Sequence, residues 1–501
     1  MSSVSRALKD DDARRDAISL HDRSILVEAG AGSGKTAVMA GRIAVMLAEG
    51  VPPRAIAAVT FTELAASELL SRVREFVADL AVGNISTELR VALPGGLSQA
   101  QRDNLAAATA VIDEITCSTI HGFCQRLIKP YPAEADIDPG AGVMDRNQAD
   151  LTFLEIVDGW LRERLSGDQD GILAEMVLHS PGETVALVYK IAENLRRCRT
   201  LAAPPVSPLD GHLTAFRQAT ADFAAFMRRA SATEPETLAI VQRLAQMATA
   251  LAAGPDPATP SGLVQLLTLR PHPDLCTKAG AFASYRKKGK WAAAAKQAGL
   301  SKADGDWLND AAEVCYNACC EAWGLLLQAA AGQVLEALID DARPILQRYR
   351  DYKRASAQLD FDDLIFAARD LLRDHNDVRR ALGQRFARVL VDEFQDTDPL
   401  QTEIFWRLCG DPVHDVDDWT RFRIRPGALF LVGDPKQAIY RFRGADVGAY
   451  VQARDAFRTQ DPDSLLSIST KFPFLRLDPC LRQRALRGHP VGRWTARLHS
   501  A

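Results

Sequence analysis

The segment AGAGSGKT, Ala29–Thr36, combines three glycines with one lysine and one hydroxyl group. Glycines let backbone N–H groups wrap an anion at the start of a helix, where unpaired donors and the helix dipole favour negative charge. The Lys35 ammonium would neutralise phosphate oxygens, and the Thr36 hydroxyl would ligate Mg²⁺. We therefore predict a phosphate-binding loop made of Ala29, Gly30, Ala31, Gly32, Ser33, Gly34, Lys35 and Thr36.

A second segment, VLVDEFQDTDP, supplies carboxylates at the end of an apolar run. Ligands of open α/β sheets bind where parallel strands end, which is the place of Asp392 and Glu393. Asp392 would hold Mg²⁺ through water, and Glu393 would be the base that polarises an attacking water. Asp398 is then expected to cap a helix whose first residue is Pro399.

A third segment, VGDPKQAIYRFRGAD, mixes an amide, arginines and aromatic rings after another apolar run. Gln437 is placed to sense the γ-phosphate of a nucleotide. Tyr440 and Phe442 offer ring faces to nucleobases, and Arg443 offers a cation to backbone phosphates. The alternative is that the two aromatic rings belong to the core of the fold.

Strands and helices must alternate if these segments are to meet. Apolar runs typical of buried strands occur at 24–29, 56–61, 388–391 and 428–432. After the first run, apolar residues recur at helical spacing up to Gly50, and 63–76 also shows one apolar helical face. The pattern predicts an α/β fold, a P-loop domain with a parallel sheet.

Between about residues 140 and 355 the strand signal disappears, and helical periodicity alternates with proline-rich breaks. We interpret this stretch as a large, mostly helical insertion, which makes the sheet domain discontinuous. The expected parts are a first sheet segment over 1–135, the insertion over 136–354, a second sheet segment over 355–460, and a remainder over 461–501.

The chain of 501 residues carries a net charge of −4, so nucleic-acid binding must come from local surfaces. The last 31 residues are unusual, with seven Lys or Arg against one acid, and the first 470 residues have a net charge of −10. The charged N-terminus and the lack of an eighteen-residue apolar run predict a cytoplasmic protein with no membrane contact. A basic run at 285–296 is interpreted as a solvated surface, with contact to duplex DNA as the alternative.

The strings AGAGSGKT, AVTFTELAASEL, STIHGFCQRL, LDFDDLI, VDEFQDTDPLQ and VGDPKQAIYRFRGAD occur in this order over about residues 10 to 470. This series resembles the motifs of the UvrD-type superfamily 1 DNA helicases. The STIHGFC string and the large insertion resemble the RecB/AddA-like branch, which serves in double-strand-break repair.

The resemblance implies a RecA-like domain in an ATP-dependent DNA helicase that moves 3′ to 5′ along single-stranded DNA. It implies ATP and Mg²⁺ as cofactors, single strands and duplex ends as substrates, and a partner helicase or nuclease subunit. By position, Asp392, Glu393 and Gln437 would form the hydrolytic site. The family's DNA contacts fall on Thr60, Phe61, Thr62, Ser118, Thr119, His121, Phe123, Tyr440, Phe442 and Arg443. In LDFDDL, a structural role near the domain junction is expected.

Two stretches depart from the family pattern. Relatives place an adenine-reading glutamine in a QRxAI-like string, where this chain has RRDAI at 14–18. After Thr470 the match to a second RecA-like domain ends, so we expect either a frameshift or a genuine short paralogue. An ATP- and DNA-binding remnant without unwinding activity is the alternative function, and an RNA helicase or a transporter ATPase is the third.

Overall fold

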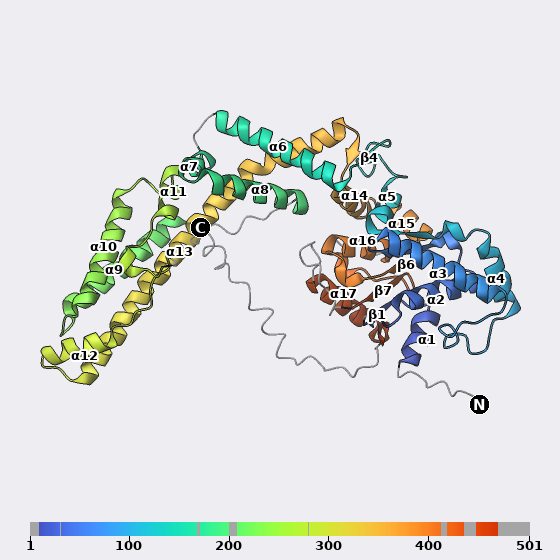
Figure 1. Ribbon diagram of the computed structural model, residues 1–501, viewed down its shortest axis with the longest axis horizontal. Coiled ribbons are helices and arrows are strands. Elements are labelled where there is room, and N and C mark those ends of the chain that lie inside the picture. The colour runs from blue at the N-terminus through green and yellow to red at the C-terminus, as the bar shows by residue number, and fades with distance from the viewer. Residues whose placement is uncertain are drawn as a thin grey trace. The chain divides into compact units, whose positions relative to one another are not determined.

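The computed structural model describes residues 10–30, 32–167, 171–199, 208–278, 280–411, 418–434 and 447–468 (Figure 1). The chain divides into two compact units. The first unit joins the part up to Ala149 to the part that begins at Lys353, and Asp150–Tyr352 belong to the second. Within the described residues, the polypeptide therefore leaves the first unit once and returns to it once.

The first unit contains a sheet of six strands whose neighbouring strands are all parallel. In spatial order the strands are β3 (Thr116–Thr119), β2 (Ile56–Thr60), β6 (Arg388–Val391), β7 (Leu429–Gly433), β1 (Ile25–Ala29) and β8 (Leu465–Ile468). The predicted α/β class is confirmed. Parallel sheets are covered on both faces, which explains why the central strands read as continuous apolar runs.

Helices cover both faces of this sheet. They are α1 (Asp11–Ser19), α2 (Lys35–Ala48), α3 (Glu63–Ala81), α4 (Gln99–Thr109), α5 (Ile120–Ile128), α14 (Phe361–Asp374), α15 (Asn376–Arg385), α16 (Pro399–Cys409) and α17 (Val447–Gln460). Ile25 and Val27 enter the core shared with α1–α4, whereas Leu26 enters the core shared with α5 and α14–α17. This alternation follows from the two-residue period of a strand.

The second unit is helical, as the sequence predicted. Its helices are α6 (Arg146–Ser166), α7 (Ile172–His179), α8 (Pro181–Cys198), α9 (Leu209–Arg229), α10 (Pro235–Ala253), α11 (Pro260–Thr268), α12 (Lys288–Gln297) and α13 (Lys302–Ala355), of which α6 and α13 begin or end in the first unit. In the basic run, Lys287 and Lys290 pair with Glu236, and Lys288 pairs with Asp306. These pairs offset part of the positive charge of the run, which agrees with a solvated surface.

Helix α13 alone among the described helices is long and apolar enough to cross a membrane by length and composition. Core helices of soluble proteins meet the same criterion. Tyr316, Trp323 and Leu326 of α13 are buried, and the Trp323 ring lies 5.2 Å from that of Phe216 in α9. These contacts are those of a helix that packs against its neighbours within a domain.

The two chain crossings are anchored in the first unit. Short strands β4 (Gly142–Val143) and β5 (Gln358–Leu359) pair in parallel beside them. Lys353, near the end of α13, is buried and places its Nζ 2.9 Å from Asp360 and 2.5 Å from Asp363. Asp360 and Asp363 also form the capping box that starts α14. The structural role predicted for LDFDDL is therefore confirmed.

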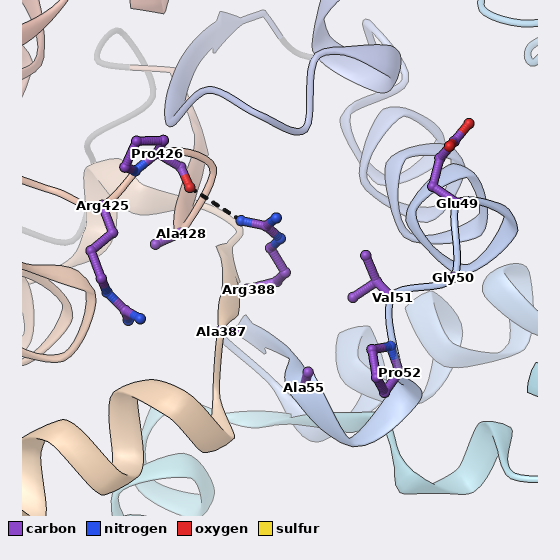
Figure 2. A pocket seen from close by; sticks show the side chains of 10 residues that line it. All are labelled: Glu49, Gly50, Val51, Pro52, Ala55, Ala387, Arg388, Arg425, Pro426 and Ala428. Atoms are coloured by element: carbon purple, nitrogen blue, oxygen red, sulfur yellow. Dashed lines mark hydrogen bonds between the residues drawn. The ribbon is translucent and has the colours of Figure 1, made fainter.

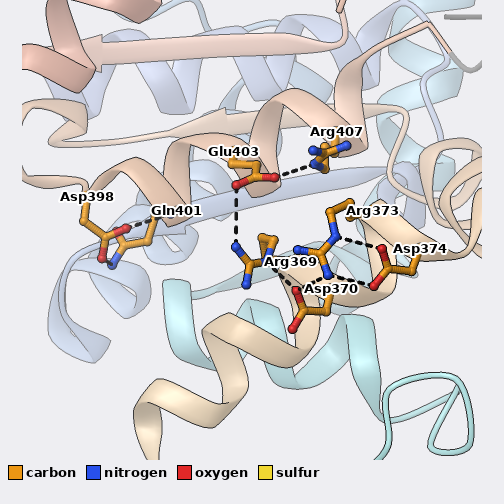
Figure 3. A network of polar contacts seen from close by, with 8 residues as sticks. All are labelled: Arg369, Asp370, Arg373, Asp374, Asp398, Gln401, Glu403 and Arg407. Atoms are coloured by element: carbon orange, nitrogen blue, oxygen red, sulfur yellow. Dashed lines mark hydrogen bonds and ion pairs between the residues drawn. The ribbon is translucent and has the colours of Figure 1, made fainter. Parts of the chain in front are cut away.

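Helices α14 and α16 are linked by a network of charged side chains (Figure 3). Glu403 of α16 lies 3.9 Å from Arg369 of α14 and 2.6 Å from Arg407. At the other end of α16, Asp398 accepts the Gln401 N–H at 2.8 Å, and Pro399 is the first helical residue. The predicted cap is confirmed, and it fixes the loop that carries the carboxylates of the site.

The amino ends of β2, β6 and β7 border an open cavity of about 510 Å³ (Figure 2). Arg388 projects into it and donates to the Pro426 carbonyl at 3.2 Å. Arg425 donates to carbonyls at the ends of α15 and α16, namely those of Gly383, Leu408 and Cys409. Helix C-termini carry partial negative charge, so the positive Arg425 guanidinium stabilises the ends of α15 and α16. We therefore assign a structural role to this edge of the sheet.

Candidate functional site

The predicted site residues that the structure describes lie at the opposite edge, where the strands end. The phosphate loop follows β1, Thr60 ends β2, Thr119 ends β3, and Asp392 directly follows β6. All strands of the sheet point the same way, so their carboxyl ends form one edge. The fold thereby gathers residues that lie more than 350 positions apart in the chain.

The phosphate loop has the backbone that an anion cradle needs. Gly32 and Gly34 have φ angles of +69° and +82°, in the left-handed region that glycine enters without strain. Gly34 directly precedes α2, whose first N–H groups have no carbonyl one turn earlier. The Ser33 hydroxyl is buried and makes no hydrogen bond within the described residues. These donors fit a bound phosphate. Ala31, which was also predicted for the loop, lies outside the described residues.

Lys35 is held by the carboxylate predicted to be the base. Its Nζ lies 2.5 Å from Glu393 Oε2, and the Lys35 side chain is only 10% exposed. Lys35 follows β1 and Glu393 follows β6, and β7 lies between these two strands. The contact therefore spans three neighbouring strands. Glu393 has a φ of +49°, a conformation that costs a residue with a side chain about 1–2 kcal/mol. The backbone is thus strained at the residue that the chemistry would use.

Three carboxylates interact electrostatically with the Lys35 ammonium, and Glu393 is the one in direct contact with it. Burial, reinforced by the charge of Glu393, raises the pKa of Asp392 to about 6. The same two causes raise the pKa of Asp396 to about 6, although Lys35 opposes the shift. The Asp396 Oδ1 atom is buried and accepts no hydrogen bond from the described residues. The pocket therefore holds more negative than positive charge and favours a further cation.

The described part of the chain supplies only part of the coordination that a metal ion needs. Within the described residues, no group of three or more His, Cys, Asp or Glu side chains is arranged to hold an ion. Mg²⁺ typically takes only one or two protein carboxylates and completes its coordination with water and substrate phosphate. Thr36, in the first turn of α2, and Asp392, with its excess negative charge, fit that incomplete donor set.

Gln395 is a site residue that sequence reasoning missed. It lies in the 3-10 turn Phe394–Asp396, is 3% exposed, and donates from Nε2 to Glu393 Oε2 at 2.7 Å. Its Oε1 accepts the N–H of Asp434 at 2.8 Å, directly after β7. An amide between carboxylates in VDEFQDT was the available signal. Gln437, predicted for a related role, lies outside the described residues.

The end of β2 presents one exposed aromatic ring. Phe61 is 39% exposed, and Thr62 next to it caps α3 by accepting the Ala65 N–H at 3.1 Å. Thr60 is buried and its hydroxyl donates to the Thr62 carbonyl, so it shapes the turn. Of these three predicted DNA contacts, Phe61 and Thr62 are the ones open to a ligand.

Two further aromatic rings, in contact with each other, lie near the end of β3. His121 of α5 lies edge-on to Phe361, with ring centroids 5.1 Å apart, and burial lowers the pKa of His121. Phe361, 40% exposed at the start of α14, was not among the predicted contacts, although an aromatic directly after a helix cap was a signal. Thr119 caps α5, and Ser118 is buried.

The predicted DNA contact of Phe123 is wrong. The side chain is fully buried, and its ring lies 5.3 Å from that of Phe386 and 6.4 Å from that of Phe405. Phe123 shares the buried face of α5 with Leu127, one turn further on, so the helical period turns it toward the core. Tyr440, Phe442 and Arg443, the remaining predicted contacts, lie outside the described residues.

A sequence model of the UvrD/REP helicase N-terminal domain matches residues 10–458, which include the phosphate loop, the acidic loop after β6 and the insertion. The chain belongs to the UvrD/REP helicase family. The order of motifs noted in the sequence and the parallel sheet that gathers them are therefore those of a UvrD/REP N-terminal domain.

Several relatives are named as the A subunit of an ATP-dependent helicase/nuclease. The protein of Desulforamulus reducens is 24% identical, over 89% of this chain and 36% of the relative. That of Lactococcus lactis is 25% identical, over 92% and 38%, and that of Moorella thermoacetica 27%, over 86% and 31%. The chain thus spans about a third of the length of these curated relatives.

The acidic loop of this UvrD/REP domain predicts a measurable effect of pH. Because the pKa of Asp392 is about 6 in the fold, against about 4 for an unfolded carboxyl, ionising it destabilises the fold as pH rises through 4 to 6. We expect Asp392→Asn to raise the free energy of unfolding by about 2 kcal/mol at pH 7.5 without Mg²⁺, and to give no gain at pH 4.

Urea unfolding at the two pH values measures this effect. The exposed Asp103→Asn, on α4, is the control and should change neither value. A loss of stability in Asp392→Asn at pH 7.5 would show that the ionised carboxylate is already compensated, contrary to the electrostatics of the loop.

Proposed function

We propose that this chain is the ATP-hydrolysing part of a DNA helicase that moves 3′ to 5′ along single-stranded DNA. The observation that carries the proposal is the contact of Lys35 with Glu393, which puts a phosphate-binding cation and a base at one point. Two exposed aromatic residues, Phe61 and Phe361, belong to the same unit; Phe61 follows the end of β2, and Phe361 starts α14.

Hydrolysis would begin when Lys35 exchanges Glu393 for a phosphate oxygen of ATP. The freed Glu393 carboxylate would accept a proton from the attacking water, which makes that water a better nucleophile. Asp392 and Thr36 would hold Mg²⁺, which when bound neutralises charge on the phosphate oxygens. The N–H groups of Gly34 and the first turn of α2 would orient the phosphates.

The DNA strand would run along the ends of β2 and β3. Phe61, His121 and Phe361 offer ring faces or edges there, and stacking contributes about 1–3 kcal/mol per base regardless of sequence. Thr62 and Thr119 would meet the backbone. Thr60 and Ser118 would support this surface from beneath, since both are buried.

The remaining assignments rest on the family. We propose ATP and Mg²⁺ as cofactors, single-stranded DNA and duplex ends as substrates, and the cytoplasm as the place of action. The relatives are named as one subunit of a helicase/nuclease, which supports a partner subunit with helicase or nuclease activity. Gln437, Tyr440, Phe442 and Arg443 stay predictions. We propose the parts expected from the sequence as the domain organisation, with the insertion over 136–354, of which the second compact unit covers Asp150–Tyr352.

ATP hydrolysis by the purified chain, with and without single-stranded DNA, tests the proposal. We expect DNA to stimulate turnover and Lys35→Ala to lower it by about 10²-fold or more, because a charge aimed at the phosphates is lost. Lys296→Ala, an exposed lysine of α12, is the matched control and should behave as wild type.

Two outcomes would contradict the proposed DNA helicase function. Nucleotide and DNA binding without stimulated turnover would assign the chain to the alternative, a binding remnant. Stimulation by RNA but not by DNA would assign it to RNA translocation, since the 2′-hydroxyl distinguishes the two polymers.

Arg14 gives a separate expectation about the base of the nucleotide. Its Nη1 lies 3.7 Å from where a Cβ of Gly34 would be, its Nη2 donates to Asp10 at 3.1 Å, and its buried Nε has no hydrogen-bond partner among the described residues. A guanidinium only donates hydrogen bonds. It can therefore bind N7 of either purine and O6 of guanine, but it cannot accept a hydrogen bond from the amino group of adenine.

We therefore expect less than about tenfold preference for ATP over GTP, and Arg14→Gln should shift the preference toward ATP by about tenfold, within the 1–3 kcal/mol of a bidentate base contact. Competition binding against a fluorescent nucleotide measures both ratios. Arg15→Gln, one residue further and more exposed, is the control. A preference for ATP above 100-fold that Arg14→Gln leaves unchanged would contradict a role for Arg14 at the base.

A further inference from the structure

The Gln395 amide joins two parts of the site that are remote in sequence. Its Nε2 donates to the Glu393 carboxylate, and its Oε1 accepts the Asp434 N–H. The orientation of the amide follows from its partners, because an ionised carboxylate only accepts and a backbone N–H only donates. A side chain that must do both at once, in a position 3% exposed, has to be an amide or an equivalent group.

The end of β7 is shaped to admit this amide. A Cβ on Gly433 would lie 2.8 Å from Gln395 Oε1, so that the amide would have to shift, and 3.2 Å from the Gln395 backbone N, which is closer than most real Cβ contacts. Glycine at this position therefore lets β7 and the turn after β6 approach each other closely while the Gln395 amide keeps its place. The contact between Gln395 and Asp434 is therefore built into the backbone of both segments.

Glu393 depends on side-chain donors for its orientation. Its backbone is in the left-handed region, and within the described residues the side chains that donate to its carboxylate are Lys35, at 2.5 Å, and Gln395, at 2.7 Å. Lys35 is also the residue that a phosphate would attract. Once Lys35 moves, Gln395 is the donor that still holds Oε2.

We propose that Gln395 is a positioning residue that holds the Glu393 carboxylate during turnover and ties it to the backbone of Asp434 at the end of β7, so that the position of this strand end sets the orientation of the base. The inference rests on the proposed function and deepens it. A displacement of Asp434 would pull the Gln395 amide, which would rotate the Glu393 carboxylate in or out of line. Hydrolysis, and its stimulation by DNA, would then depend on the position of the Asp434 backbone at the end of β7.

Two variants separate the functions of the amide. Gln395→Met keeps the length of the side chain and removes both hydrogen bonds. Gln395→Glu keeps an acceptor for the Asp434 N–H, removes the donor, and adds a negative charge beside Glu393. Gln401→Met is the matched control, because its amide donates to the cap residue Asp398 on the same loop and helix.

Steady-state hydrolysis gives the first readout. We expect Gln395→Met to lower kcat about 30-fold with KM for ATP within threefold, and to reduce stimulation by single-stranded DNA to less than twofold. Gln395→Glu also lacks the donor to Glu393, so we expect the same fall in kcat. Gln401→Met should match wild type in all three measurements.

Hydrogen exchange gives a readout that needs no activity. The Asp434 amide should lose its protection in Gln395→Met and keep it in Gln395→Glu, where an acceptor remains. If the wild type shows no DNA-stimulated turnover, the proposed function fails, yet this exchange pattern still decides whether Gln395 holds β7.

Either of two results would overturn the inference. One is equal exchange of the Asp434 amide in wild type and Gln395→Met. The other is a Gln395→Met enzyme whose kcat falls while DNA stimulates it by the same factor as wild type, because the base would then be positioned without reference to β7.

Discussion

The contact between Lys35 and Glu393 is the interaction on which the site depends. A single ammonium lies among the carboxylates of Asp392, Glu393 and Asp396, of which Asp392 and Asp396 have a raised pKa. The site thus has surplus negative charge and a lysine whose present partner can be exchanged for phosphate. A bound nucleotide with Mg²⁺ would supply both the anion for Lys35 and the cation for the carboxylates.

The fold serves this contact by bringing strand ends together. β1 and β6 flank β7, so residues 358 positions apart meet without any irregular connection. The insertion leaves this arrangement intact because both crossings are fastened in the first unit, at the β4–β5 pair and at the buried Lys353. Asp398 and Thr62 cap the helices that follow two of the strand ends, which fixes where these helices begin.

Local sequence patterns were sufficient to predict much of the fold and of the site. The strand, glycine loop and helix around Lys35 were predictable from residue types in sequence, and so were the cap at Asp398 and the helical insertion. Phe123 was misplaced because a motif position was weighed without the helical period that it shares with Leu127. Gln395 and Phe361 were missed because their partners, Asp434 and His121, are distant in sequence, and only the packed fold brings them together.

The measurement that tests the account most directly is nucleotide affinity in Glu393→Gln. If Lys35 must leave Glu393 before it can bind phosphate, removing the charge of Glu393 should tighten ATP binding by about tenfold, or 1.4 kcal/mol, while turnover is lost. Glu403→Gln, which changes a carboxylate paired with Arg407 on α16, should leave the affinity unchanged. Equal or weaker ATP binding in Glu393→Gln would contradict the account.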